Sequence, residues 1–138
     1  MAYQYTTWTP DLETGNSIID AQHQQLIAAV NNLFATRQKS GKGRKEVEQT
    51  MDFLVEYTVR HFSDEEALQQ KYGYPEYSAH KQLHAEFKKK ARELAGELYK
   101  FGPLEDLVNN VCVVIGRWVV NHIKAEDFKL VEYIRSKE

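Results

Sequence analysis

The sequence predicts an all-α protein that folds as an up-down-up-down antiparallel four-helix bundle. Four segments carry apolar residues at alternating spacings of three and four, which is typical of one face of an α-helix. These segments are roughly 20 to 28 residues long and are joined by short turns, as expected for antiparallel neighbours in a bundle. No stretch alternates apolar and polar residues with a period of two, so a β-rich fold is excluded.

The order of the elements follows from where glycine and proline interrupt the helical pattern. The expected elements of a single domain over residues 1–138 are a polar N-terminal arm at 1–16, helices at about 18–38, 45–72, 76–100 and 104–123, and a short C-terminal helical segment at about 124–135. The helices of the bundle thus occupy about 18–123. A flexible charged turn is expected at 39–43, and breaks are expected at Gly73–Pro75 and Gly102–Pro103, with Pro103 in a first-turn position.

Each helix has a predicted inward stripe. The stripes are Ile19, His23, Leu26, Val30 and Leu33; Val47, Met51, Leu54, Thr58, His61, Glu65 and Leu68; His80, His84, Phe87, Ala91, Leu94 and Leu98; and Leu104, Val108, Val111, Ile115, Trp118 and His122. Each stripe contains a histidine where a bundle normally has leucine.

Composition excludes several classes of function. The net charge is −2 and the 18 lysines and arginines are scattered, so neither nucleic acid nor an anionic membrane is an expected partner. No window approaches the roughly 18 apolar residues of a membrane span, and no secretory signal is visible. The single cysteine, Cys112, lies in an apolar run and is expected to be a buried, inert thiol. A cytoplasmic location is expected.

All five histidines of the chain fall on the inward stripes. Five unliganded imidazoles in one core would each need a hydrogen-bond partner or incur about 1–3 kcal/mol of desolvation. A shared metal removes that difficulty, because neutral imidazole is a common ligand of iron, zinc and copper. His23, His61, His80, His84 and His122 are therefore predicted metal ligands that converge at one end of the bundle.

Acidic residues are expected to join the histidines. Glu65 follows His61 by four residues on the second stripe, whereas the helical step of about 100° turns its neighbour Glu66 away from the seam. Near His122, regular α-helical spacing favours Glu126. A wide π-type turn between Val120 and Asp127 would instead bring Asp127 onto the inward face.

The motif resembles that of the bacterial hemerythrins. It consists of His23, then His61-Phe-Ser-Asp-Glu65, then His80-Lys-Gln-Leu-His84, then His122-Ile-Lys-Ala-Glu-Asp127. Trp8, Asp20, Tyr74-Pro75 and Trp118 are flanking features of the same resemblance, which extends from about residue 5 to 135.

The resemblance implies a non-heme diiron centre. His80, His84 and His122 would bind one iron, His23 and His61 would bind the other, and Glu65 and Asp127 would bridge the pair together with an oxo or hydroxo group. The iron with two histidines would keep one position open for molecular oxygen. Zinc or manganese are alternative metals for such donors.

The expected oxygen pocket is apolar and aromatic. Its residues are Leu26, Phe62, Trp118, Val119 and Ile123. Two positions depart from the family pattern: Val119 stands where relatives usually have leucine or isoleucine, and Gln69 where they often have methionine. The shorter Val119 is expected to widen access, and Gln69 either brings polarity towards the site or faces solvent.

The function predicted from these residues is reversible binding of molecular oxygen for transport, storage or delivery, without enzymatic activity. Nitric oxide and small anions are further candidate ligands of the open iron. The alternatives are a domain that senses oxygen, redox state or nitric oxide, and a diiron oxidase or peroxidase. Ferritin-like diiron enzymes use more carboxylates, which favours oxygen binding here. No particular protein partner is indicated.

Overall fold

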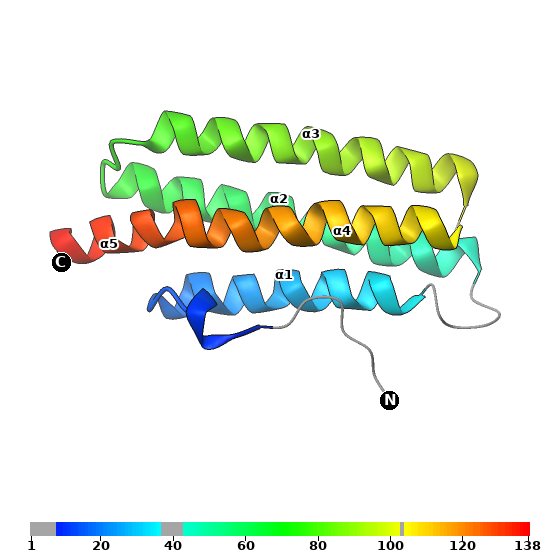
Figure 1. The fold of residues 1–138 in the computed structure, drawn as a ribbon. Helices are drawn as coiled ribbons and strands as arrows, with labels where there is room; N and C mark the ends of the chain where they lie inside the picture. The colour runs from blue at the N-terminus through cyan, green and yellow to red at the C-terminus, as the bar shows by residue number, and fades with distance from the viewer. Residues whose placement is uncertain (1–7, 37–42, 103) are drawn as a thin grey trace.

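The fold is an antiparallel four-helix bundle in up-down-up-down order (Figure 1). The computed structural model describes residues 8–36, 43–102 and 104–138. Its elements are η1 (Pro10–Leu12), α1 (Ser17–Thr36), α2 (Arg44–Lys71), α3 (Tyr77–Phe101), α4 (Glu105–His122), η2 (Ile123–Asp127) and α5 (Phe128–Lys137). In Figure 1, η2 and α5 continue the rod that α4 begins. The described residues contain no β-strand, so the predicted fold class is confirmed.

The helix boundaries lie close to those expected from the glycine and proline positions. The expected charged turn at 39–43 lies outside the described residues except for Gly43, and so does Pro103. Gly102 ends α3 with φ of +83°, a conformation that favours glycine, and its N–H donates to the carbonyl of Leu98 at 2.9 Å.

The interior is built from the predicted stripes. Leu33, Met51 and Val108 are 0% exposed, and Cys112 is buried as expected. One stripe prediction is wrong. Leu104 is 57% exposed, because it precedes α4 in an extended conformation (φ −68°, ψ 132°) and does not share the inward face of that helix.

A network of hydrogen bonds anchors the N-terminal arm to the start of α1. The carboxylate of Asp20 accepts from the N–H and the hydroxyl of Thr14 at 2.9 and 2.7 Å, and from the N–H of Gly15 at 3.0 Å. The side chain of Asn16 accepts from the N–H groups of Ile18 and Ile19, which caps the helix. The first turn of α1, three residues before His23, is therefore held in place.

A second apolar cluster attaches α5 to the bundle. It contains Ile19, Tyr74, Leu130, Val131 and Ile134. Because Ile19 lies on α1 and Tyr74 on the α2–α3 turn, this cluster closes the end of the bundle that carries the histidines. Among the described residues no helix combines the length and the apolar character that crossing a bilayer would require.

Two adjacent isoleucines on α1 provide a matched test of this packing. Ile19 is 2% exposed and Ile18 is 70% exposed. We expect Ile19→Ala to lower the free energy of unfolding of the metal-free protein by about 2–5 kcal/mol, because it leaves a cavity. Ile18→Ala should change it by no more than about 0.5 kcal/mol. Urea denaturation followed by circular dichroism measures both, and equal losses would contradict the observed orientation of α1.

Candidate metal centre

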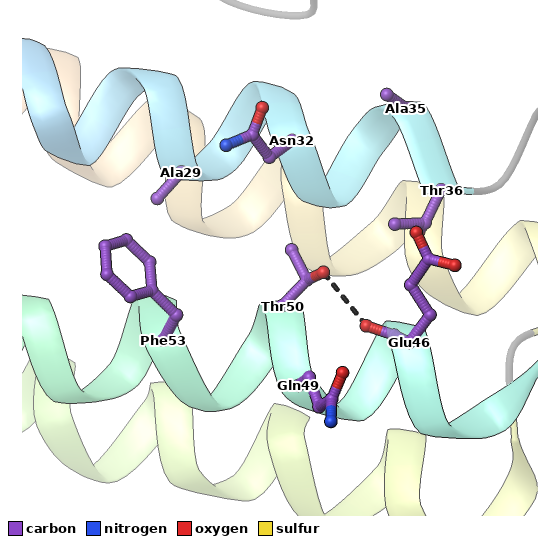
Figure 2. A pocket seen from close by; sticks show the side chains of 8 residues that line it. All are labelled: Ala29, Asn32, Ala35, Thr36, Glu46, Gln49, Thr50 and Phe53. Atoms are coloured by element: carbon purple, nitrogen blue, oxygen red, sulfur yellow. Dashed lines mark hydrogen bonds between the residues drawn. The ribbon is translucent and has the colours of Figure 1, made fainter.

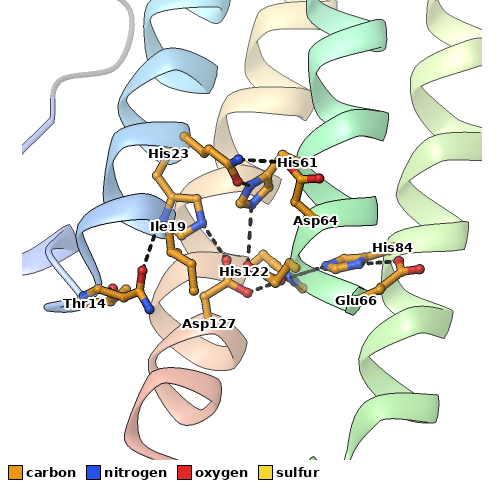
Figure 3. A network of polar contacts seen from close by, with 12 residues as sticks. Thr14, Ile19, His23, His61, Asp64, Glu66, His84, His122 and Asp127 are labelled. Atoms are coloured by element: carbon orange, nitrogen blue, oxygen red, sulfur yellow. Dashed lines mark hydrogen bonds and ion pairs between the residues drawn. The ribbon is translucent and has the colours of Figure 1, made fainter. Parts of the chain in front are cut away.

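The seven predicted ligands form one buried cluster between the helices. Figure 3 shows part of this cluster, with His23, His61, His84, His122 and Asp127 labelled. None of the seven ligands is more than 7% exposed. They are His23 on α1, His61 and Glu65 on α2, His80 and His84 on α3, His122 on α4 and Asp127 on η2. Since the bundle is antiparallel, residues early in α1 and α3 meet residues late in α2 and α4.

The cluster divides into two groups that share their carboxylates. One group contains His80, His84, His122, Glu65 and Asp127, and the other contains His23, His61, Glu65 and Asp127. Within each group one ligand atom per residue lies within 4.8 Å of the others. Two cation positions bridged by Glu65 and Asp127 are therefore compatible with the side chains as they stand.

Metal-donor atoms crowd together in both groups, and those of His23, Glu65 and Asp127 have no hydrogen-bond partner. The Nε2 atoms of His80 and His122 lie 2.9 Å apart, and those of His84 and His122 lie 3.2 Å apart. His23 Nε2 approaches Asp127 Oδ2 to 2.8 Å, yet neither atom has a partner in hydrogen-bond geometry, and the same holds for both oxygens of Glu65. Unsatisfied buried acceptors are costly, and cations between them would satisfy all of them at once. The donor set of imidazoles and carboxylates fits iron, zinc or manganese.

A π-helical turn places Asp127 in the cluster. Residues Ile123–Asp127 form η2, so the expected irregularity after Val120 is present. This turn brings Asp127 Oδ1 to 3.2 Å from His122 Nε2, across five residues, and leaves Asp127 1% exposed. Glu126, which regular α-helical spacing favoured, is half-buried and belongs to neither group of ligands.

Burial and neighbouring groups shift the pKa values of the cluster in opposite directions. Burial lowers the pKa of His61 to about 4, so its imidazole is neutral and ready to bind a cation. For His80 burial is outweighed by polar contacts with Asp127 and Glu65, which raise its pKa to about 9. Burial alone would raise the pKa of Asp127, but contacts with His122, His23 and His80 hold this pKa well below its usual range. Asp127 is therefore an anion within the cluster.

Three further polar side chains contact the outer nitrogens of ligand histidines. The amide oxygen of Gln22 accepts from His61 Nδ1 at 2.6 Å, and its amide nitrogen donates to Asp64 at 3.0 Å. A carboxylate oxygen of Glu66 accepts from His84 Nδ1 at 2.8 Å. The amide of Gln69 lies 3.0 Å from His80 Nδ1, and a half-turn of that amide would offer the ring N–H an oxygen acceptor. Such contacts set the tautomer and orientation of metal-binding histidines.

Most of these outer contacts were not predicted from the sequence. Gln22 was not among the predicted site residues, and Glu66 lies off the inward seam as expected, but it is half-buried and reaches His84 on α3. Gln69 is 0% exposed, so it faces the site and not solvent. Each of these residues is adjacent to a ligand or four positions from one, which is the signal that could have found them.

The five residues expected to form an oxygen pocket line one cavity next to the two-histidine group. Leu26, Phe62, Trp118, Val119 and Ile123 are joined there by the ligands His23, His61, His122 and Asp127 and by Thr58, which the sequence placed in the core but not in the pocket. The cavity measures about 10 Å³, enough for one water-sized molecule.

Aromatic stacking holds two of the ligand rings. The Phe62 ring stacks on His84 with centroids 3.8 Å apart at 3°, and the Trp118 ring stacks on His122 at 4.2 Å and 12°. Phe62 and Trp118 thus both line the cavity and orient ligand rings.

A larger hollow of about 410 Å³ lies on the surface between α1 and α2 (Figure 2). Ala29, Thr50 and Phe53 are among the residues that line it, and the Thr50 hydroxyl donates to the carbonyl of Glu46 at 2.9 Å. None of the seven predicted ligands reaches this hollow, so it is separate from the cluster.

Known proteins share both the sequence pattern and the fold. The family model described as "Hemerythrin HHE cation binding domain" matches residues 14–134. The chain is 32% identical to a bacteriohemerythrin of Stenotrophomonas maltophilia over 94% of this chain and 81% of that protein. It is 31% identical to the myohemerythrin of Sipunculus nudus over 88% of both chains. A crystal structure of a hemerythrin mutant superposes with a TM-score of 0.80 at 28% identity, covering 95% of this chain and 98% of that one.

The π-helical turn makes a testable distinction between two neighbouring acids. We expect Asp127→Ala to reduce the bound metal from two ions per chain to one or none, because it removes a carboxylate shared by both groups. Glu126→Ala should keep both ions. Metal analysis of the two variants by mass spectrometry, after identical loading, measures the difference. A loss of metal in Glu126→Ala with full loading of Asp127→Ala would show that Glu126, and not Asp127, binds the metal.

Proposed function

The chain belongs to the hemerythrin family, and we propose that its seven clustered ligands hold two iron ions and bind molecular oxygen reversibly. In this proposal His80, His84 and His122 hold one iron and His23 and His61 hold the other. Glu65 and Asp127, which belong to both groups, would hold both ions. The observation that supports it is the division of the cluster into groups of three and two histidines with shared carboxylates.

The unequal groups explain where a ligand would enter. The two-histidine group offers one protein donor fewer than the three-histidine group, and the small cavity borders the two-histidine side. When bound, an iron pair supplies an open coordination position and the two electrons that reversible oxygen binding requires.

The protein side chains supply the surroundings that such binding needs. Phe62 and Ile123 are 2% and 1% exposed, and Val119 is 3% exposed, so the cavity wall excludes bulk water. A dry, low-dielectric pocket disfavours the escape of charged oxygen species and the entry of additional protons. The chain's contribution is therefore to keep the oxygen-binding side apolar and the ligand rings fixed.

The donor set supports oxygen binding rather than catalysis. Five histidines and two carboxylates leave the centre poor in anionic ligands compared with ferritin-like diiron enzymes. Nitric oxide and small anions are further ligands that the open position could accept. A cytoplasmic location is part of the proposal, supported by the presence of a single cysteine, Cys112, which has no second cysteine in this sequence to form a disulfide with.

A reversible optical change tests the proposed function. We expect the purified protein to contain two irons per chain, and its anaerobically reduced form to develop a visible charge-transfer band on exposure to air. Removal of oxygen should abolish the band, and repeated cycles should restore it. Immediate, irreversible conversion to a ferric form would contradict an oxygen carrier and would favour a sensor or an oxidase.

Val119 provides a test of the cavity. The leucine of Val119→Leu would add one methylene to the cavity wall, so we expect slower autoxidation of the oxygenated protein, because solvent reaches the site less readily. Val120→Leu is the matched control, since Val120 packs against the core without lining the cavity. The decay of the oxygenated spectrum in air measures both rates. Equal rates in Val119→Leu and the parent protein would sink the idea that this side chain sets access.

A further inference from the structure

The outer nitrogens of the ligand histidines meet side chains of different charge in the two halves of the cluster. In the two-histidine half, His61 Nδ1 meets the neutral amide of Gln22 at 2.6 Å. In the three-histidine half, His84 Nδ1 meets the carboxylate of Glu66 at 2.8 Å (Figure 3). Among the described residues Glu66 is the one carboxylate that contacts the outer nitrogen of a cluster histidine.

We propose that Glu66 is a positioning residue whose negative charge makes the three-histidine half of the centre the more electron-rich and the more tightly metal-binding half. This inference rests on the proposed diiron function and adds a division of labour between the two metal positions. The three-histidine half would stabilise the higher positive charge on its metal. The two-histidine half, beside the cavity, would bind its metal less tightly.

Burial strengthens the contact between Glu66 and His84. The His84 side chain is 0% exposed and that of Glu66 is 14% exposed, so solvent screens the charge only in part. The His84 ring is also clamped in plane by Phe62, at 3.8 Å and 3°, which keeps Nδ1 directed at the carboxylate and Nε2 directed at the cluster. A carboxylate at Nδ1 raises the basicity of the opposite nitrogen, which is the donor to the metal.

The contact of Gln22 cannot have the same effect. Its amide oxygen accepts from His61 Nδ1 and orients the ring, but it carries no net charge. The carboxylate of Asp64 is exposed and contacts the amide nitrogen of Gln22, at 3.0 Å, on the side of that amide away from its contact with His61 Nδ1. The rings of His61 and His84 are therefore oriented by similar contacts, but only the partner of His84 carries a charge.

Three variants separate charge from orientation. Glu66→Gln keeps an oxygen acceptor for His84 Nδ1 and removes the charge, whereas Glu66→Leu removes both. The double variant Gln22→Glu with Asp64→Asn places a carboxylate against His61. The amide introduced at position 64 can still form a hydrogen bond with that carboxylate. Circular dichroism of each metal-free variant first establishes that the helical fold is retained.

The primary measurement is stepwise zinc binding to the metal-free protein in competition with a chelator. We expect Glu66→Gln to weaken one of the two zinc steps by roughly 10- to 100-fold, the range typical of partners that orient metal ligands. The double variant should strengthen the other step. The ¹⁵N signals of the His84 ring in the zinc form identify the affected half. A purely orienting role predicts that Glu66→Gln matches the parent protein and that Glu66→Leu alone is weakened, and that result would overturn the proposal.

The midpoint potential of the iron form is the second measurement. Glu66→Gln should raise the potential of the first one-electron oxidation, by about 59 mV for each tenfold change in the relative stability of the two oxidation states. An unchanged potential together with unchanged zinc binding refutes the role of Glu66. If instead the parent protein binds two metals without binding oxygen, the proposed function fails while the zinc result on Glu66 still decides the inference.

Discussion

Five imidazoles and two carboxylates share one buried volume in this bundle. The need to balance their charge and satisfy their polar atoms is the constraint on which the rest of the structure depends. Histidine nitrogens lie as close as 2.9 Å, and all four carboxylate oxygens lack hydrogen-bond partners. A low-dielectric interior penalises each of these groups severely unless positive charge lies between them. Cation binding would therefore contribute to the stability of this end of the bundle as well as to its function.

The same constraint explains the irregular backbone between α4 and α5. An α-helix projects residues four apart onto one face, whereas His122 and Asp127 are five apart. The π-helical turn over Ile123–Asp127 absorbs the extra residue and aligns both side chains with the cluster. The apolar cluster around Leu130 and Ile134 then anchors α5 and holds the turn in position. Packing beyond the site thus maintains a backbone geometry that the ligands need.

In the proposed diiron centre, the surroundings of the two ligand groups differ in ways that would favour different tasks. Aromatic and aliphatic side chains line the cavity on the two-histidine side, and the outer carboxylate of Glu66 lies on the three-histidine side. An apolar wall favours a neutral diatomic ligand over water, whereas an outer anion stabilises positive charge on the metal. In the proposed centre, one half would thereby bind the ligand and the other would hold charge.

The local periodicity of the sequence determined the fold and brought the five histidines and Glu65 onto inward faces, because a helical face depends only on residues a few positions apart. Tertiary structure decided the rest. The choice between Glu126 and Asp127 depended on a backbone turn that packing of α5 supports, and Leu104 left the core because the helix begins one residue later. Glu66 points off the seam, as its helical angle requires, yet it reaches His84 because α3 lies beside α2. A helical wheel gives the direction in which a side chain leaves its own helix, but only the neighbouring helix determines what that side chain touches.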